Sequence, residues 1–264
     1  MPSPRELVAQ SRNRDVGYSV VSPISFPPEL VQDVYNNVRM TPIYSHFQSS
    51  IGTKVLVALS GLGLVGYVVF HMLGNLQVFE GPHALNTYAA FLRDMPILLW
   101  TARIGLLSVV VVHVVLTIRL SLRNRQARPT AYATHRYRQA SIASRTMAVS
   151  GSVVLLFIVF HLLHLTAGVV GPSPADLIDV EGHHDVYRKL LHAFQNPVMV
   201  AIYLAGQVGL AFHLSHAVSS IWQTLGLEHA TLNRLFKAAG PSVALFVVLG
   251  NVAIIVAIFL GIVR

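Results

Sequence analysis

Apolar residues along the chain gather into five long blocks, which polar segments separate. The blocks cover residues 53–77, 98–121, 147–170, 198–223 and 242–263. Each is long enough to cross a bilayer, which takes about 20 mostly apolar residues. Because a lipid-exposed backbone must satisfy its own hydrogen bonds, each block is predicted to be a helix. The pattern therefore predicts an all-α, polytopic membrane protein with five transmembrane helices.

The composition agrees with this pattern and excludes an ordinary soluble domain. Apolar residues make up 53% of the 264 residues and charged residues only 11%, against roughly 25% charged residues in soluble domains. The chain has no cysteine. This excludes disulfides, and also any iron–sulfur cluster or thiolate-bound haem that this chain would ligate alone.

The net charge of +8 is distributed unevenly between the two sides of the predicted membrane. The segment between the second and third blocks has no acid and carries Arg119, Arg123, Arg125, Arg128, Arg136, Arg138 and Arg145. The loops on the other side carry Glu80, Asp94, Asp176, Asp179, Glu181 and Asp185 against Arg93, Arg188 and Lys189. The positive-inside rule therefore predicts a cytoplasmic N-terminus and an external C-terminus. The basic charge on the cytoplasmic side sets the topology and contacts anionic lipid. This accounts for the positive net charge, so a nucleic-acid partner is not expected.

Residues 1–48 precede the first block and are predicted to form a cytoplasmic N-terminal arm, with residues 49–264 forming the transmembrane domain. The arm contains one weakly amphipathic stretch, ELVQDVYNNVRM. Two interpretations stay open for it: a disordered arm, or a segment that folds against a partner on the cytoplasmic side.

Six of the thirteen histidines lie within the apolar blocks: His71, His113, His161, His164, His213 and His216. Ionisable groups inside spans usually face the bundle interior and mark functional sites. The alternative for each one is a neutral imidazole that hydrogen-bonds to a neighbouring helix. Four different blocks supply these histidines, which favours a shared site.

Depth in the membrane sorts four of the histidines into two pairs. With a rise of about 1.5 Å per residue, His71 and His161 lie roughly 25 Å from the cytoplasmic edge, whereas His113 and His213 lie roughly 9 to 14 Å from it. We call these the outer pair and the inner pair. Two pairs at two depths fit two bis-histidine haems in a four-helix bundle, because a haem iron takes axial ligands from opposite sides. Zinc is a weaker candidate, since four ligands would have to converge at one depth.

Two further features of the blocks have both a haem-related and an ordinary interpretation. Small residues close to the histidines allow either the approach of a flat macrocycle or close helix packing: Ser60, Gly61, Gly63, Gly66, Ser152, Gly206 and Gly209. Arg103 lies inside the second block and needs an anion, for which a propionate of the outer haem is a candidate. The alternative is that its guanidinium reaches back to the outer surface.

Three stretches carry a recognisable set of motifs: SSIGTKVLVALSGLGLVGYVVFHMLGNLQVF with its HxxGN element, GPHALNTYAAFLRDMP, and DVYRKLLHAFQNPVMVAIYLAGQVGLAFHLSHAVSSIWQTLGL. They resemble the first membrane helix, the short interfacial helix, and the fourth membrane helix with its preceding amphipathic segment in one family. This family is the single-chain, five-helix, dihaem cytochrome b subunit of bacterial succinate dehydrogenase (complex II). The resemblance covers roughly residues 49–263 and leaves out the N-terminal arm.

The resemblance implies an electron-transport function in the respiratory chain and the tricarboxylic acid cycle. Such a subunit lies in the bacterial inner membrane, binds two haem b, and anchors a flavoprotein subunit and an iron–sulfur subunit on the cytoplasmic face. It passes electrons to a quinone, either menaquinone or ubiquinone, and does not itself oxidise succinate. The family's four ligand positions correspond to His71, His113, His161 and His213. Whether the complex forms a higher oligomer is left open.

Four other polar residues have possible roles in this setting. His164 and His216 each follow a ligand position by one turn and would bond propionates, carry protons, or pair across helices. Ser50 and Lys54 open the first span at the cytoplasmic edge, a region where the family binds quinone. A serine cap and a lysine reaching to the surface are the alternatives for these two residues.

Several alternative functions remain open on the sequence. A fumarate reductase subunit would carry the reverse flux, and a variant whose histidine pair ligates a Rieske-type cluster would need cysteines from a partner. A free-standing transmembrane cytochrome b would be expected to carry a flavin or nicotinamide domain, which the chain does not contain. A transporter that uses the histidines for protons would show internal repeats and broken helices, which we do not find.

Overall fold

The computed structural model describes residues 27–30, 32–33, 49–127, 140–171, 177–227, 229 and 231–264. The chain divides into two compact units, Met1–Ser45 and His46–Arg264. The few described residues of the first unit are exposed. Most of the predicted arm with its amphipathic stretch lies outside the described residues, as do Arg128, Arg136, Arg138 and Asp176.

The described part of the second unit is helical and contains no β-strand, although an isolated bridge pairs Ile178 with His184. The elements in chain order are α4 (Ser50–Asn75), the 3-10 helix η1 (Leu76–Glu80), α5 (Pro82–Arg93), α6 (Pro96–Gln126), α7 (Ile142–Arg145), α8 (Met147–His161), the π-helix η2 (Leu162–Thr166), α9 (Val186–Gln195), α10 (Pro197–Thr224) and α11 (Asn233–Phe259). Among the residues described, five segments are long and apolar enough to cross a membrane: Ser50–Glu80, Pro96–Gln126, Met147–Thr166, Pro197–Thr224 and Asn233–Phe259. The all-helical class and the five long apolar helices are thus confirmed.

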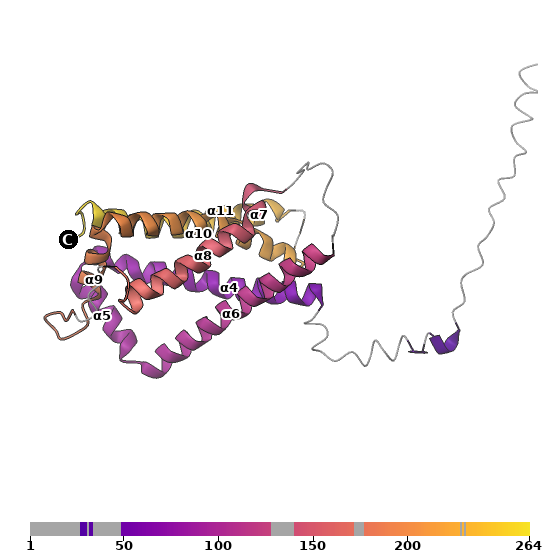
Figure 1. Ribbon diagram of the computed structural model, residues 1–264, viewed down its shortest axis with the longest axis horizontal. Coiled ribbons are helices and arrows are strands. Elements are labelled where there is room, and N and C mark those ends of the chain that lie inside the picture. The colour runs from indigo at the N-terminus through magenta and orange to yellow at the C-terminus, as the bar shows by residue number, and fades with distance from the viewer. Residues whose placement is uncertain are drawn as a thin grey trace, which may run out of the picture. The chain divides into compact units, whose positions relative to one another are not determined.

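Helix α10 runs alongside α11 in Figure 1, and it packs more extensively against other helices than any other described helix does. It packs against α11, α8 and α4, and it buries ten of its residues. Helix α6 packs against α4 and, near its start, against α5, and it buries none. α5, α9 and the C-terminus gather at one end of the long helices, which we call the α5/α9 end.

A compact apolar cluster closes the α5/α9 end. It joins η1, α5, α9, α10 and α11 through Val78, Leu85, Tyr187, Leu190, Ala193, Phe194, Val200, Tyr203 and Ile258, among others. One buried amide links α5 to α9: Asn86 Nδ2 donates to Asp185 Oδ1 over 3.1 Å, and Asn86 Oδ1 accepts from the backbone N–H of Tyr187 over 3.0 Å. Asp185 in turn caps the N-terminus of α9 by accepting from the backbone N–H of Arg188. The amphipathic helix α9 is therefore anchored to α5 at its first turn.

The contact between α10 and α11 combines a polar pair with a very close backbone approach. Asn251 Nδ2 donates to Gln207 Oε1 over 3.0 Å between apolar helices, an arrangement that stabilises helix pairs in membranes. At the other end of the contact, a Cβ built on Gly240 would collide with the backbone oxygen of Ser215 and the hydroxyl of Ser219. Only glycine allows α11 to pass this close to α10.

The fifth span begins at Asn233, not near residue 242 as the hydropathy predicts, and Pro241 lies inside the helix. A proline inside a helix removes the hydrogen bond to the carbonyl four residues earlier, which here belongs to Lys237. The hydroxyl of Ser219 on α10 lies 3.2 Å from that oxygen and donates to it. A side chain from a neighbouring helix therefore compensates for the break, as is common in membrane helices.

The third span is shorter than the sequence predicts. The prediction extends it to residue 170, whereas α8 ends at His161 and the π-helix η2 ends at Thr166. Gly168 and Gly171 follow with φ values of 67° and 72°, a left-handed conformation that favours glycine. π-helical turns often occur at functional sites, and this one contains His164.

Replacing Gly240 by alanine is expected to destabilise the protein by about 1 to 3 kcal/mol, because the added methyl group overpacks a contact with backbone atoms that cannot move independently. The measurement is thermal unfolding in mild detergent. Gly105→Ala on α6 is the matched control, since a Cβ there has no neighbour within 4 Å. Equal melting temperatures for the two variants would contradict the close-packing role of Gly240.

Candidate functional site

The structure brings the two histidines of the outer pair together from α4 and α8. The ring centroids of His71 and His161 lie 5.9 Å apart, with an angle of 89° between the ring planes. Two imidazoles that share a metal through bonds of about 2 Å each have centroids roughly 6 Å apart. The spacing of the outer pair therefore fits two ligands on opposite sides of one iron.

The two outer histidines have different surroundings. The His71 ring stacks on Tyr67 with the centroids 5.4 Å apart, and Asn75 Nδ2 lies 3.2 Å from His71 Nε2. His161 instead places its Nδ1 3.4 Å from the hydroxyl of Tyr203 on α10, which leaves its Nε2 free of this contact.

His164 is completely buried and pairs across helices. Its Nδ1 lies 3.0 Å from the same Tyr203 hydroxyl. Its other ring nitrogen, Nε2, is buried with no hydrogen-bond partner among the described residues, close to Gly171 and Met199. Of the three roles considered for His164, this geometry fits pairing across helices.

The inner pair comes from α6 and α10. His113 and His213 lie close enough for their charges to interact. His113 Nδ1 lies 3.0 Å from Ser60 Oγ on α4. Because the Ser60 hydroxyl donates to the Leu56 carbonyl over 2.8 Å, its oxygen is left to accept a hydrogen bond from the N–H at His113 Nδ1. That tautomer leaves the lone pair of His113 Nε2 available to a metal. His213 Nδ1 is buried and has no partner among the described residues.

Glycines face both imidazoles of the inner pair. A Cβ on Gly61 of α4 would lie 3.3 Å from Cε1 of His113, and a Cβ on Gly151 of α8 would lie 3.2 Å from Cε1 of His213. Each inner histidine therefore lies against a glycine on the neighbouring helix, where a larger residue would crowd the ring.

The other small residues noted in the sequence do not contact the inner histidines in this way. Gly206 and Gly209 receive Phe157 and Val153 of α8, respectively, which is ordinary close helix packing. Positions 63 and 66 have no heavy atom within 4 Å of an added Cβ. The Ser152 hydroxyl donates to the backbone of its own helix, at Ala148.

The remaining predicted site residues lie at the edges of the bundle. Arg103 is exposed, and its guanidinium lies 5.3 Å from the centre of the Trp100 ring, a favourable cation–π arrangement. His216 is half-buried one turn beyond His213. Ser50 and Lys54 are exposed at the start of α4, where Ser49 rather than Ser50 caps the helix by accepting from the Gly52 N–H.

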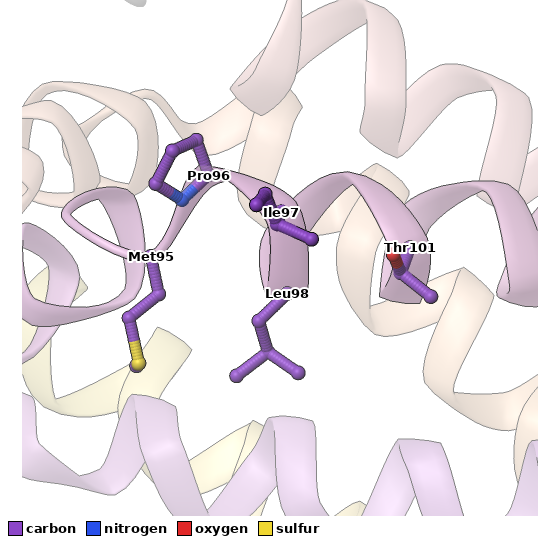
Figure 2. Close-up of a pocket in the computed structure, with 5 residues that line it drawn as sticks. All are labelled: Met95, Pro96, Ile97, Leu98 and Thr101. Atoms are coloured by element: carbon purple, nitrogen blue, oxygen red, sulfur yellow. The ribbon is translucent and has the colours of Figure 1, made fainter.

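Two hollows in the described surface are lined by none of the paired histidines. A notch of about 430 Å³ at the α5–α6 corner is lined by Met95, Pro96, Ile97, Leu98 and Thr101. In Figure 2 the side chains of Met95 and Leu98 extend to the same side of the chain. The lining has no ionisable side chain, so it lacks the groups needed for redox or acid–base chemistry.

A polar turn that contains Asp179, Glu181 and His183 lies near α5. Burial opposes ionisation of Asp179, but the backbone N–H groups of His183 and Glu181 donate to its carboxylate and hold its pKa below the usual range. Glu181 Oε1 lies 2.9 Å from Nδ1 of His83 on α5. The turn is thereby tied to α5 on the same side as the outer pair.

Among the residues that the structure describes, no three or more His, Cys, Asp or Glu side chains converge as a metal site. Sequence reasoning missed Tyr203 and Gly151. Tyr203 lies 42 positions from His161 along the chain, and glycines such as Gly151 are common in membrane helices, so neither carries a local signal.

No known protein family, curated protein or solved structure matches the chain. Its function is therefore inferred from its own residues and their geometry.

Proposed function

We propose that this chain is the membrane-anchor, cytochrome b subunit of a bacterial succinate:quinone oxidoreductase, with its N-terminus in the cytoplasm. It holds two haem b, anchors a flavoprotein subunit and an iron–sulfur subunit on the cytoplasmic face, and passes their electrons to membrane quinone. The observation that carries the proposal is that His71 and His161 meet from two long apolar helices, while His113 and His213 of two others lie near enough for their charges to interact.

The donor set of each pair fits a haem iron. In the outer pair the centroid spacing of 5.9 Å suits two axial imidazoles. In each pair one histidine has its Nδ1 next to a hydroxyl, from Ser60 or from Tyr203, and a second-shell bond of this kind leaves Nε2 free and makes it more basic. Bound haem would supply one-electron redox chemistry at each level of the membrane.

The helices around the inner pair also favour a large planar group. Gly61 and Gly151 keep Cβ atoms away from the two imidazoles. Helix α6, which supplies His113, buries none of its side chains. A macrocycle between α6 and α10 would cover apolar surface on the inward face of α6, which is favourable by about 25 cal/mol per Å².

Residues at the two membrane surfaces have supporting roles in this proposal. Arg103 and His216 are candidates for binding haem propionates, because each lies near a surface beyond one of the histidine pairs. Ser50 and Lys54, exposed at the start of α4, would donate to a quinone carbonyl close to the docked iron–sulfur subunit. An apolar slot beside such donors is what a quinone requires.

The haem content of single variants tests the ligand map. Wild-type protein is expected to contain two b haems per chain by pyridine haemochrome quantitation, and His71→Leu or His213→Leu is expected to lose one of them. His192→Leu, which changes an exposed histidine on α9, is the matched control and should keep both. A wild-type protein without haem would refute the proposal, and retention of both haems in the two ligand variants would refute the assignment of ligands.

Replacing Gly151 by valine is expected to abolish the inner haem selectively, because the added side chain would occupy the position of the His213 ring. Potentiometric titration of the visible spectrum should then show one redox component where the wild type shows two. Gly105→Val on α6, at an open position, controls for the cost of valine in a helix. A Gly151→Val protein with both components would contradict the proposed place of the inner haem.

Purification from the producing cell tests the partners. A tagged chain extracted in mild detergent is expected to bring with it a flavin-containing and an iron–sulfur subunit, and the preparation should reduce quinone with succinate. Haem-containing protein that purifies without either subunit would instead indicate a free-standing cytochrome b. A complex that works only with fumarate as electron acceptor would assign the reverse direction.

A further inference from the structure

The hydroxyl of Tyr203 contacts two histidines at once. It lies 3.0 Å from Nδ1 of His164 and 3.4 Å from Nδ1 of His161. Tyr203 is 4% exposed and His164 is 0% exposed, so water does not compete for these bonds. A chain of three polar groups thus leads from a proposed haem ligand into the apolar cluster at the α5/α9 end.

Packing fixes the position of the phenol. The Tyr203 ring meets Phe157, Phe160 and Phe194 edge to face, with centroid distances of 5.2, 5.9 and 4.9 Å. Aromatic pairs in this geometry stabilise one another beyond the apolar area that they bury. His164, in the π-helical turn η2, lies with its ring centroid 5.6 Å from that of Tyr203.

The three groups can share their hydrogens in only one direction if His161 binds iron. Ligation through Nε2 requires the His161 proton to be on Nδ1, where it donates to the Tyr203 oxygen. The single hydroxyl hydrogen of Tyr203 then donates to Nδ1 of His164, whose own proton is on Nε2. The opposite direction would place a proton on Nε2 of His161 and block ligation.

We infer that Tyr203 and His164 are positioning residues that fix the ring orientation and the tautomer of His161, and thereby set the redox potential of the outer haem. This inference rests on the proposed function, since it takes His161 as an axial ligand. Neither residue touches the iron, and both act through the Nδ1–H bond of His161.

The chain of bonds also predicts the direction of the effect. Donation from Tyr203 to His164 polarises the phenol oxygen, and coupled hydrogen bonds strengthen each other in a medium of low dielectric constant. The stronger bond from His161 Nδ1–H makes the ligand more basic, which favours ferric over ferrous iron. The intact chain of hydrogen bonds from His161 through Tyr203 to His164 therefore lowers the redox potential of the outer haem.

The main test is Tyr203→Phe, which keeps the aromatic cage and removes the hydroxyl. Both haems should be retained. The outer haem should titrate at a more positive potential than in the wild type, and its low-spin electron paramagnetic resonance signal should shift. His164→Leu should move the same component in the same direction by a smaller amount. Tyr187→Phe is the matched control, because that buried hydroxyl donates to the backbone of Arg264 instead, and it should change neither haem.

Two outcomes would overturn the inference. One is a Tyr203→Phe protein that holds both haems with wild-type potentials and resonance signals. The other comes from haem-free protein labelled with ¹⁵N-histidine in nanodiscs, where the Nδ1 resonances of His161 and His164 should both shift in Tyr203→Phe, because both nitrogens lose their contact with the hydroxyl. Unchanged resonances in the variant would refute the chain of hydrogen bonds even where no haem is bound, so this result is separate from a failure of the proposed function.

Discussion

An imidazole buried between apolar helices has no water to bond with, so each of its nitrogens must find a partner inside the protein or remain at a cost of a few kcal/mol. The arrangement of the long helices depends on how this requirement is met. Ser60 on α4 meets it for His113 on α6, and Tyr203 on α10 meets it for His161 and His164. The same hydroxyls therefore join helices together and decide which nitrogen of each ring stays free.

The two histidine pairs share one asymmetry. In each pair one ring is anchored through Nδ1 by a hydroxyl on another helix, and its partner is less constrained. His213 has no bond at Nδ1 among the described contacts, and His71 bonds only Asn75 of its own helix. An anchored ring defines the orientation of a ligand in advance, while a freer ring can adjust to the position of the metal. His71 would have to release Asn75 to offer Nε2 to a metal, so under the proposed function it would be the more adaptable ligand of the outer pair.

The sequence is sufficient for the five long helices, because a block of apolar residues reports the length of a membrane span. It is not sufficient where a neighbouring helix decides the outcome. Hydropathy predicts the start of the fifth span near residue 242, but α11 begins at Asn233 and continues through Pro241, where the Ser219 hydroxyl on α10 donates to the freed carbonyl of Lys237. Similarly, Tyr203 is one aromatic residue among many until the fold places it between His161 and His164.

Helix packing and the proposed cofactors explain each other. α10 is enclosed by its neighbours, whereas α6 reaches the rest of the bundle through α4 and α5 and buries no side chain. His113 on α6 lies near enough to His213 on α10 for their charges to interact. If both imidazoles bind one iron, the inner haem is a structural link between these helices as well as an electron carrier. A ligand that binds only the folded state adds to the stability of that state. Helix α6, which buries no side chain, would be stabilised most by such binding. A peripheral helix that buries no side chain of its own but carries one proposed ligand is what a bundle that assembles around a cofactor would contain.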